Sequence, residues 1–407
     1  LGFALWRRDR KAAALVAVSA APALAAPKPA APVTNAAPGD AYYQAGQAAL
    51  AKALTVNPRT GKAKNVILFL GDGMGISTVT AGRIYDGQLK GVDGESNSLA
   101  FEKLSYAALS KTYSHDTQVT DSAAGITAIM TGVKTRNKII GLTGAAIGEK
   151  CETEAGNRVE TLAELAKAGG KAAGVVTTTR VTHATPAGAY AHTAYRDWEG
   201  DSDMPVEALQ GGCKDIARQL VEAPDALRLD VVMGGGRSRF LPEDKEGKRA
   251  DGRDLTAEWL KAEGAGSSYV TTVDQLKALP SDTRHVLGLF APEHLPYEVE
   301  RPVLGQGVPT LAEMATSAVD VLSKNPNGYF LLIEGGKIRE LRPDIAASGD
   351  DVAVIDAANR IVLPGFIDTH HHFYQGLLRG ILTNGLLNPD YNRDIANTLT
   401  PAYAPAD

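Results

Sequence analysis

The sequence predicts an α/β protein built on a doubly wound, mostly parallel sheet. Short apolar runs that end at a glycine or a polar residue recur along the chain, as buried parallel strands do. Segments with a helical pattern separate these runs, so that strands and helices alternate. A chain of 407 residues, 44% of them hydrophobic, is also long and apolar enough to bury the core of such a fold.

Five strands and three helices are expected, in addition to a helix that begins near Ser122. The run 65–70 is apolar almost throughout, which is typical of a central strand covered on both faces. The other strands are expected at 172–178, 230–233, 286–290 and 329–333. The helices are expected at 161–168, 216–222 and 311–323.

The amino terminus has the parts of a secretory signal: a charged stretch at 7–11, an apolar run at 12–21 and small residues at 23–25. We expect a signal peptide at 1–25 and an Ala/Pro linker at 26–39, hence a periplasmic or secreted protein. A low-complexity Ala/Pro tail is the alternative. The apolar run is too short to span a membrane, and the net charge of -5 argues against nucleic acid as a partner.

Ser122 is the first candidate functional residue. It follows Asp121 and precedes a run of small and apolar residues, which predicts a serine on the first turn of a buried helix. The free amide groups and the dipole at such a helix end favour a bound anion and a more acidic hydroxyl. A serine that only caps the helix is the alternative.

Asp72 is the second candidate, because it directly follows the strand expected at 65–70. Open α/β sheets place their sites at the carboxyl ends of their strands, and glycines at 71, 73 and 75 allow a tight turn around the carboxylate. A carboxylate in this position is a candidate ligand for a divalent cation. A helix cap in a turn is the alternative.

A cluster of polar residues follows the strand at 172–178 and is expected at the same edge of the sheet as Asp72. It contains His183, Thr185, His192 and Arg196. Arg196 could hold phosphate oxygens with its guanidinium group, although a surface ion pair would also explain an arginine there. The two cysteines, Cys151 and Cys213, are expected either to form one disulfide or to be two separate buried thiols.

From about residue 40 to residue 336 the chain resembles the alkaline phosphatase family. The resemblance rests on the strings at 71–75, 119–124, 178–186, 191–193, 234–237 and 309–314. It implies an incomplete sheet of that type, a homodimer and Mg²⁺ and Zn²⁺ as cofactors. It also implies that Cys151 and Cys213 form a disulfide.

The resemblance further assigns roles to the candidate site residues. Ser122 would be the nucleophile that becomes a phosphoserine, and Arg196 would hold the phosphate oxygens. Asp72 would bridge a zinc ion and the magnesium ion. Thr185 and Glu334 would bind magnesium, and His183 would lie near that site.

The end of the chain departs from this family. Where the family has an aspartate and a histidine that bind zinc, this chain has Arg339 and Pro343. The segment 337–407 instead resembles the β-rich amino-terminal fragment of a metal-dependent amidohydrolase. In that resemblance His370 and His372 would be a metal pair, and an adventitious metal patch is the alternative. The two resemblances meet at 333–336, which predicts a chimera.

Three hypotheses follow. The first is a phosphomonoester hydrolase that is impaired because most zinc ligands are missing. The second is an amidohydrolase or deaminase fragment that uses His370 and His372. The third is a non-catalytic chimeric remnant. The first accounts for most of the chain, and small phosphomonoesters are its expected substrates.

Overall fold

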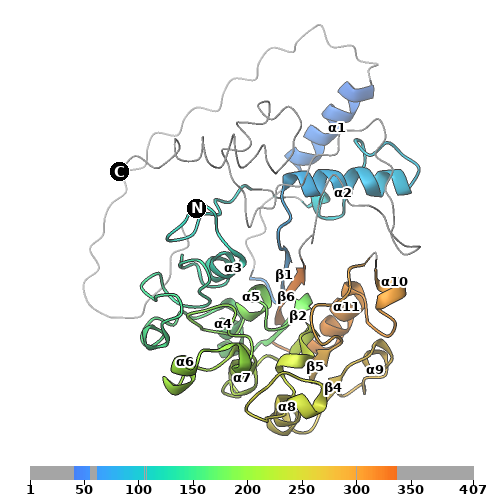
Figure 1. The fold of residues 1–407 in the computed structure, drawn as a ribbon. Helices are drawn as coiled ribbons and strands as arrows, with labels where there is room; N and C mark the ends of the chain where they lie inside the picture. The colour runs from blue at the N-terminus through green and yellow to red at the C-terminus, as the bar shows by residue number, and fades with distance from the viewer. Residues whose placement is uncertain (1–40, 56–61, 105, 107, 299, 337–407) are drawn as a thin grey trace, which may run out of the picture. The chain divides into compact units, whose positions relative to one another are not determined.

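A computed structural model describes residues 41–55, 62–104, 106, 108–298 and 300–336 (Figure 1). The chain divides into two compact units, Leu1–Thr60 and Gly61–Asp407. In the first unit the described part forms helix α1 (Ala41–Leu54). The α-helices in the described part of the second unit are α2 (Ile76–Leu89), α3 (Ser122–Thr131), α4 (Leu162–Ala168), α5 (Ala184–Ala187), α6 (Val206–Gln210), α7 (Ile216–Val221), α8 (Leu255–Glu263), α9 (Val273–Lys277), α10 (Arg301–Leu304) and α11 (Leu311–Leu322). Short 3₁₀ turns lie at Phe101–Lys103, Cys151–Thr153, Asp201–Asp203, Arg237–Arg239 and Glu243–Lys245.

The described residues of the second unit form one sheet, in which every paired strand is parallel to its neighbour. Its strands are β1 (Val66–Gly71), β2 (Ala172–Arg180), β3 (Val231–Gly235), β4 (Ser267–Val270), β5 (His285–Leu289) and β6 (Tyr329–Gly335). Their order in the sheet is β1-β6-β2-β3-β5-β4. The predicted mostly parallel sheet with flanking helices is therefore confirmed, and the β-rich segment predicted at 337–407 lies outside the described residues. Strand β4 was not predicted, because its four residues, Ser-Ser-Tyr-Val, form no apolar run.

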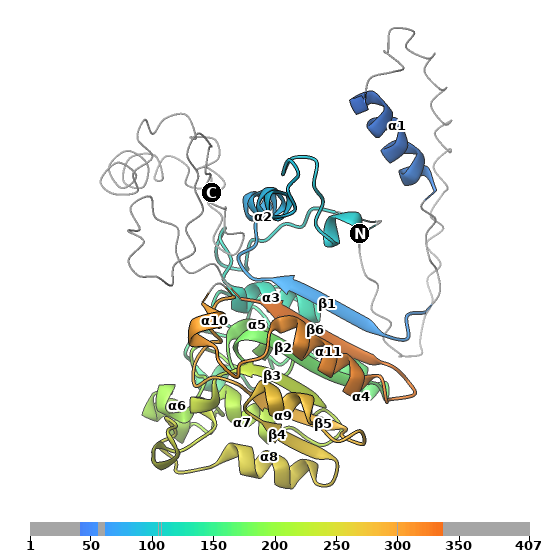
Figure 2. The ribbon, with the colours of Figure 1, turned by 90° about the vertical axis from the view of Figure 1, so that its right-hand side faces the viewer.

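Helices pack on both faces of this sheet (Figure 2). One apolar core joins alternate strand residues such as Val175 and Leu332 to side chains of α3, α4, α7 and α8. The other core joins the intervening strand residues, such as Val176 and Ile333, to α9 and α11. Because successive strand residues point to opposite faces, each buried strand contributes to both cores. In the described residues no helix is long and apolar enough to cross a membrane.

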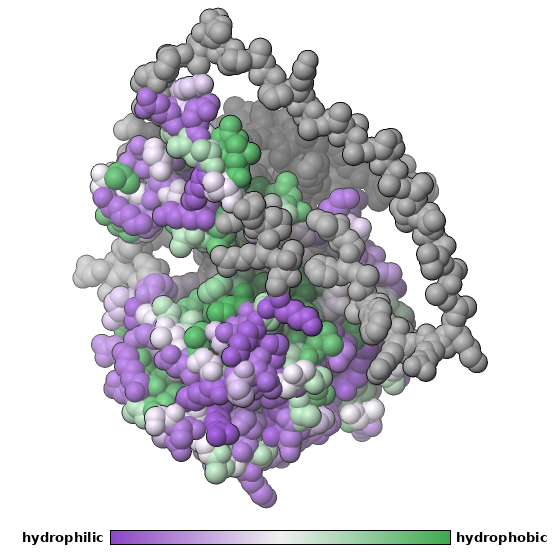
Figure 3. Space-filling model, turned by 180° about the vertical axis from the view of Figure 1, so that it is seen from behind, coloured by the Kyte–Doolittle hydropathy of each residue, from purple (hydrophilic) through white to green (hydrophobic). Residues whose placement is uncertain are grey.

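The prediction that 65–70 forms a central, fully covered strand is wrong. Within the described part of the chain, β1 pairs only with β6 and lies at one edge of the sheet. Leu68 packs against the first core, whereas Phe69, which lies beside Ile333 on the opposite face, is 72% exposed. An apolar sequence favours burial of a strand. Whether the strand is buried depends on which other elements pack on its two faces. Apolar residues also reach the surface in the space-filling view (Figure 3).

This difference in cover predicts unequal costs for two phenylalanine substitutions. Phe69→Ala should lower the free energy of unfolding by less than about 1 kcal/mol, since its ring is mostly solvated. Phe330→Ala should cost about 3–5 kcal/mol, because that ring is 4% exposed and lies in the first core. Urea unfolding of both variants measures the difference. Equal losses would show that β1 is fully covered in solution.

Cys151 and Cys213 are joined by a disulfide, with their Cα atoms 5.8 Å apart. The bridge closes a loop of 62 positions and adjoins a small core that includes Ile139, Leu142 and Trp198. This loop carries the predicted phosphate-binding and magnesium-binding residues after β2. The bridge therefore ties the two ends of a segment that supports the candidate site.

Replacing both cysteines by alanine should lower the free energy of unfolding by about 2–4 kcal/mol, because the unfolded chain regains the entropy that the closed loop removes. Thermal unfolding with and without a reductant measures the effect. Reductant should lower the melting temperature of the parent chain and leave that of the double variant unchanged. A reductant effect of equal size on both proteins would contradict this assignment.

Candidate metal and phosphate site

Three strand ends bring the candidate residues to one edge of the sheet. Asp72 directly follows β1, and its amide donates to the carbonyl of Gly335 at 3.1 Å. Glu334 lies near the end of β6, in register with Leu70 of β1 and Thr177 of β2. The segment after β2 leads to α5. The candidate residues thus lie at the carboxyl ends of parallel strands, where open α/β sheets usually place their sites.

Ser122 is the first residue of α3, and its neighbour Asp121 is the cap. The Asp121 Oδ1 atom accepts from the amide of Ala124 at 3.0 Å, so the helix end does not need Ser122 as its cap. The Ser122 hydroxyl instead donates to Asp72 Oδ2 at 2.9 Å. Both side chains are buried, at 5% and 3% exposure. The serine therefore points at the carboxylate that ends β1.

Glu334 is fully buried, and only one of its two oxygens is bonded within the described residues. Its Oε2 atom accepts from the hydroxyls of Thr177 and, at 3.0 Å, Thr179. The Oε1 atom is buried and has no hydrogen-bond partner among the described residues. Burial, together with the nearby charge of Asp72, raises the pKa of Glu334 to about 7, although the threonine hydroxyls act in the opposite direction. A buried carboxylate of this kind needs a proton or a cation.

Asp72, His183 and Glu334 form a group that fits a metal ion. Each offers a ligand atom, and these atoms lie within 4.8 Å of one another. Two carboxylates and a hydroxyl side chain, Thr185, supply the oxygen ligands that Mg²⁺ prefers. Thr185 is 1% exposed, and its hydroxyl acts to lower the pKa of Glu334. The half-bonded Glu334 carboxylate supports the same conclusion, so the residues present fit the cation that the family implies.

Arg196 lies between the metal group and α3. Its Nη1 atom donates to Asp121 Oδ2 at 3.1 Å, and its Nη2 atom donates to His183 Nε2 at 2.9 Å, since a guanidinium group has no acceptor. The arginine is thus partly buried beside the amino terminus of α3. Arg196 also forms ion pairs with Asp121 and, at 3.7 Å, with the exposed Asp197, so the salt-bridge alternative accounts for part of its position.

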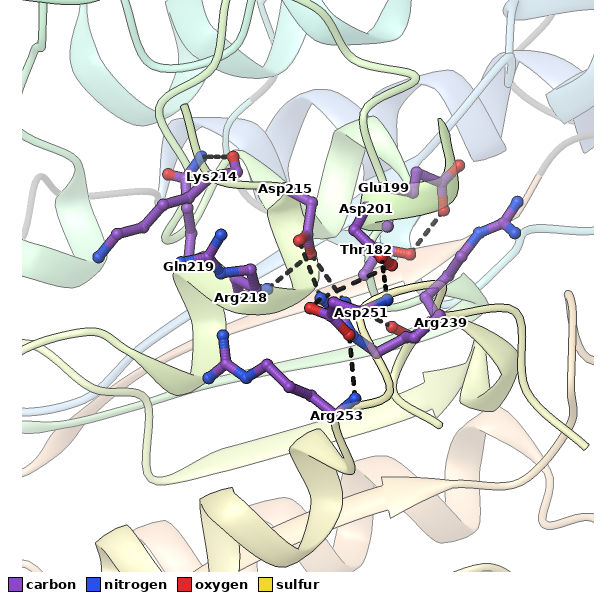
Figure 4. A network of polar contacts seen from close by, with 12 residues as sticks. Thr182, Glu199, Asp201, Lys214, Asp215, Arg218, Gln219, Arg239, Asp251 and Arg253 are labelled. Carbon is purple, nitrogen blue, oxygen red and sulfur yellow. Dashed lines mark hydrogen bonds and ion pairs between the residues drawn. The ribbon is translucent and has the colours of Figure 1, made fainter. Parts of the chain in front are cut away.

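A buried ion-pair network supports the segment that follows Arg196. Arg249 is fully buried and donates to both oxygens of Asp215, each at 3.2 Å, and to Asp251. The Asp201 carboxylate accepts from the amide of Asp251 at 2.7 Å. Asp201, Asp215 and Asp251 converge in Figure 4. Such a network ties Asp201, in the segment after Arg196, to Arg249 and Asp251.

Not every candidate residue lies at the metal group. Some residues that do lie beside it were not predicted from the sequence. His192 does not reach the metal group, because its ring nitrogens lie 2.8 Å from the Gly141 carbonyl and 3.0 Å from Glu164. Thr177 and Thr179 were not predicted, although two threonines spaced by two in an apolar strand indicate a shared polar face. His294 was also missed, and its ring packs edge-on against His183 with centroids 5.5 Å apart. His370 and His372 lie outside the described residues.

The alkaline phosphatase family model matches residues 63–353. The chain belongs to the alkaline phosphatase family. The match extends beyond the boundary predicted at residue 336. Alkaline phosphatase from Gadus morhua is 45% identical over 307 residues, which are 72% of this chain and 63% of the relative. The tissue-nonspecific alkaline phosphatase of Gallus gallus is 47% identical over 291 residues, 68% of this chain and 55% of that protein.

A solved structure supports the same family at the level of the fold. The alkaline phosphatase of Thermus thermophilus superposes with a TM-score of 0.54 at 32% identity, covering 69% of this chain and 52% of its own. This alkaline phosphatase family chain thus spans between about half and two thirds of the relatives it matches. What those longer proteins do as a whole is therefore a proposal for this chain.

Proposed function

We propose that the chain hydrolyses phosphomonoesters through a phosphoserine at Ser122. The observation that carries this proposal is the contact between the Ser122 hydroxyl and Asp72 at the metal group. In the first step Ser122 Oγ would attack phosphorus, the bond from phosphorus to the ester oxygen would break, and the alcohol would leave. Water would then attack the phosphoserine and release phosphate.

The phosphate group would lie between α3 and Arg196. The amides at the start of α3 and the positive end of its dipole favour an anion beside Ser122. Arg196 would turn one or both of its guanidinium donors from Asp121 and His183 to phosphate oxygens, for which its planar fork is suited. The support is the position of the arginine beside the helix end.

We propose that Asp72, Thr185 and Glu334 hold Mg²⁺, with His183 next to it. Bound divalent cations in this family's reaction neutralise phosphate charge and make the attacking hydroxyl more acidic. Asp72 would also be shared with a zinc ion. Because Arg339 and Pro343 stand where zinc ligands are expected, we propose that zinc binding is weak and that turnover is low.

A phosphatase assay with defined metals tests this function. The purified chain should hydrolyse an aryl phosphate in the presence of Mg²⁺, and EDTA should abolish the activity. Added Zn²⁺ should leave the rate well below that of the Gadus morhua relative measured in parallel. Zinc-activated turnover equal to that of the relative would contradict the impairment. A folded chain that neither hydrolyses the ester nor binds phosphate would contradict the function itself.

The remaining proposals rest on the sequence. Export to the periplasm or outside the cell and action as a homodimer follow from the amino-terminal pattern and the family. The amidohydrolase hypothesis requires a metal-dependent amidohydrolase activity that disappears when His370 and His372 are both replaced by alanine. No specific observation on the described residues favours it over phosphate ester hydrolysis.

A further inference from the structure

A pocket of about 290 Å³ lies apart from the metal group, and none of its lining residues belongs to that group. Its walls come from helix α4 and the segment before it, the loop after α5, helix α7 and the residue Lys214 before it, and the loop that leads to β3. The volume is at the lower end of the range for small-molecule sites in proteins. The pocket therefore suits a compact ligand of about the size of a single aromatic ring.

Most charges in this pocket are already paired. Glu164 caps the start of α4 by accepting from the Thr161 amide at 2.8 Å, and its other oxygen lies 3.0 Å from His192. Burial would raise the pKa of Glu164, but the bond and charge of His192 lower it overall. Glu222 is held by Lys214 at 2.9 Å and by two arginines outside the pocket wall. Neither carboxylate therefore presents an uncompensated charge to the pocket.

Arg158 is the exception among the charged groups of this wall. Its side chain makes no hydrogen bond and no ion pair within the described part of the protein, and its charge acts only at longer range on Glu154 and Glu164. A guanidinium group offers five donors in a planar fork that matches a carboxylate. The pocket thus carries one cation whose donors are available to a ligand.

The remaining wall is mostly apolar. Leu220 and Leu229 are each 1% exposed, and Leu227 and Pro224 line the same space. The Tyr190 hydroxyl is occupied, since it donates to the Val181 carbonyl at 2.9 Å. Figure 4 shows the Lys214 side chain extending away from the Asp215–Asp251 group. A ligand here would meet one cationic side and one apolar side.

We propose that this pocket binds a small carboxylate with an apolar body, with its carboxylate on Arg158 and its body against Leu227 and Pro224. Charge alone would favour any anion, whereas the apolar wall favours an organic one over inorganic phosphate. The site is independent of the proposed phosphatase chemistry, because it shares no residue with Ser122, Arg196 or the metal group.

Calorimetric titration of the full chain with benzoate, hexanoate, acetate and inorganic phosphate tests the proposal. Benzoate and hexanoate should bind at least about tenfold more tightly than acetate or phosphate. Arg158→Gln should weaken benzoate binding by about tenfold or more, and Ala223→Phe, which fills the apolar side, should block it. Lys261→Gln, which removes an exposed cation on α8, is the matched control and should leave the affinity unchanged.

Two further arms locate the binding. Benzoate affinity should persist in Arg196→Gln, since that arginine belongs to the phosphate site; loss of binding there would overturn the pocket assignment. Unchanged binding in both Arg158→Gln and Ala223→Phe would also overturn it. Equal affinities for benzoate and phosphate would contradict the apolar part of the proposal. Thermal melts of each variant show that lost binding does not come from lost folding.

Discussion

Ser122→Ala should reduce the rate of phosphomonoester hydrolysis by about 10³-fold or more, because the proposed phosphoryl acceptor is removed. The variant should also fail to retain phosphate covalently after denaturation of a reaction mixture with radiolabelled substrate. The parent chain should retain it on Ser122. This second measurement works even if the parent chain turns over slowly, since it counts phosphoserine rather than product.

An exposed serine provides the control for this experiment. Ser202 lies on a 3₁₀ turn, is exposed and makes no side-chain hydrogen bond within the described residues. Ser202→Ala should keep both the rate and the covalent label. Ser122→Ala should also keep a cooperative thermal melt, because Asp121 rather than Ser122 caps α3. Undiminished labelling in Ser122→Ala would place the phosphoryl acceptor on another residue.

Glu334→Gln should make the metal-free chain more stable at alkaline pH. Because its pKa rises from 4.5 to about 7 on folding, Glu334 holds its proton more tightly in the folded chain. The stabilisation that protonated Glu334 gives to the folded chain is therefore fully present below about pH 4.5. It is lost as the pH rises through about 7. A neutral glutamine avoids this loss. The stability advantage of the variant should grow by about 2 kcal/mol from about pH 5.5 to about pH 8.

With magnesium bound, the parent chain rather than Glu334→Gln should be the more stable protein at alkaline pH. A bound cation replaces the missing proton, so Mg²⁺ should raise the melting temperature of the parent chain at about pH 8 and leave that of Glu334→Gln unchanged. Glu207→Gln is the matched control, because Glu207 is exposed on α6 and its side chain has no bonded partner in the described part. A magnesium shift that survives in Glu334→Gln would place the cation elsewhere.

More of the candidate site than of the strand order in the sheet could be predicted from the sequence. Asp72 and Ser122 could be proposed from local pattern, because strand ends and helix starts leave signals that parallel strands collect at one edge, whereas Glu334 was proposed only from the family resemblance. The order of strands leaves no such signal. The apolar run of β1 indicates burial, yet Phe69 lies on a face that no described element covers.

Side-chain partners were the least predictable part. Local pattern could not decide between Asp121 and Ser122 as the cap of α3, since both residue types cap helices. His192 and His183 follow the same strand, yet an antiparallel bridge between Ile140 and Thr193 draws His192 toward Gly141. A side-chain contact with a segment that is distant in the sequence depends on the tertiary fold, so local sequence pattern cannot predict it.

The pairing of β1 with β6 also sets an order of assembly on the ribosome. The side-chain oxygen of Asn65, the residue before β1, accepts from the amide of Tyr329, 264 positions later. Synthesis proceeds from the amino terminus at roughly 5–20 residues per second, so β1 emerges well before its only described partner. During that interval an uncharged strand, Val-Ile-Leu-Phe-Leu-Gly, has no neighbour. The nascent chain should therefore depend on chaperones until Gly335 has emerged, and the metal group cannot form earlier.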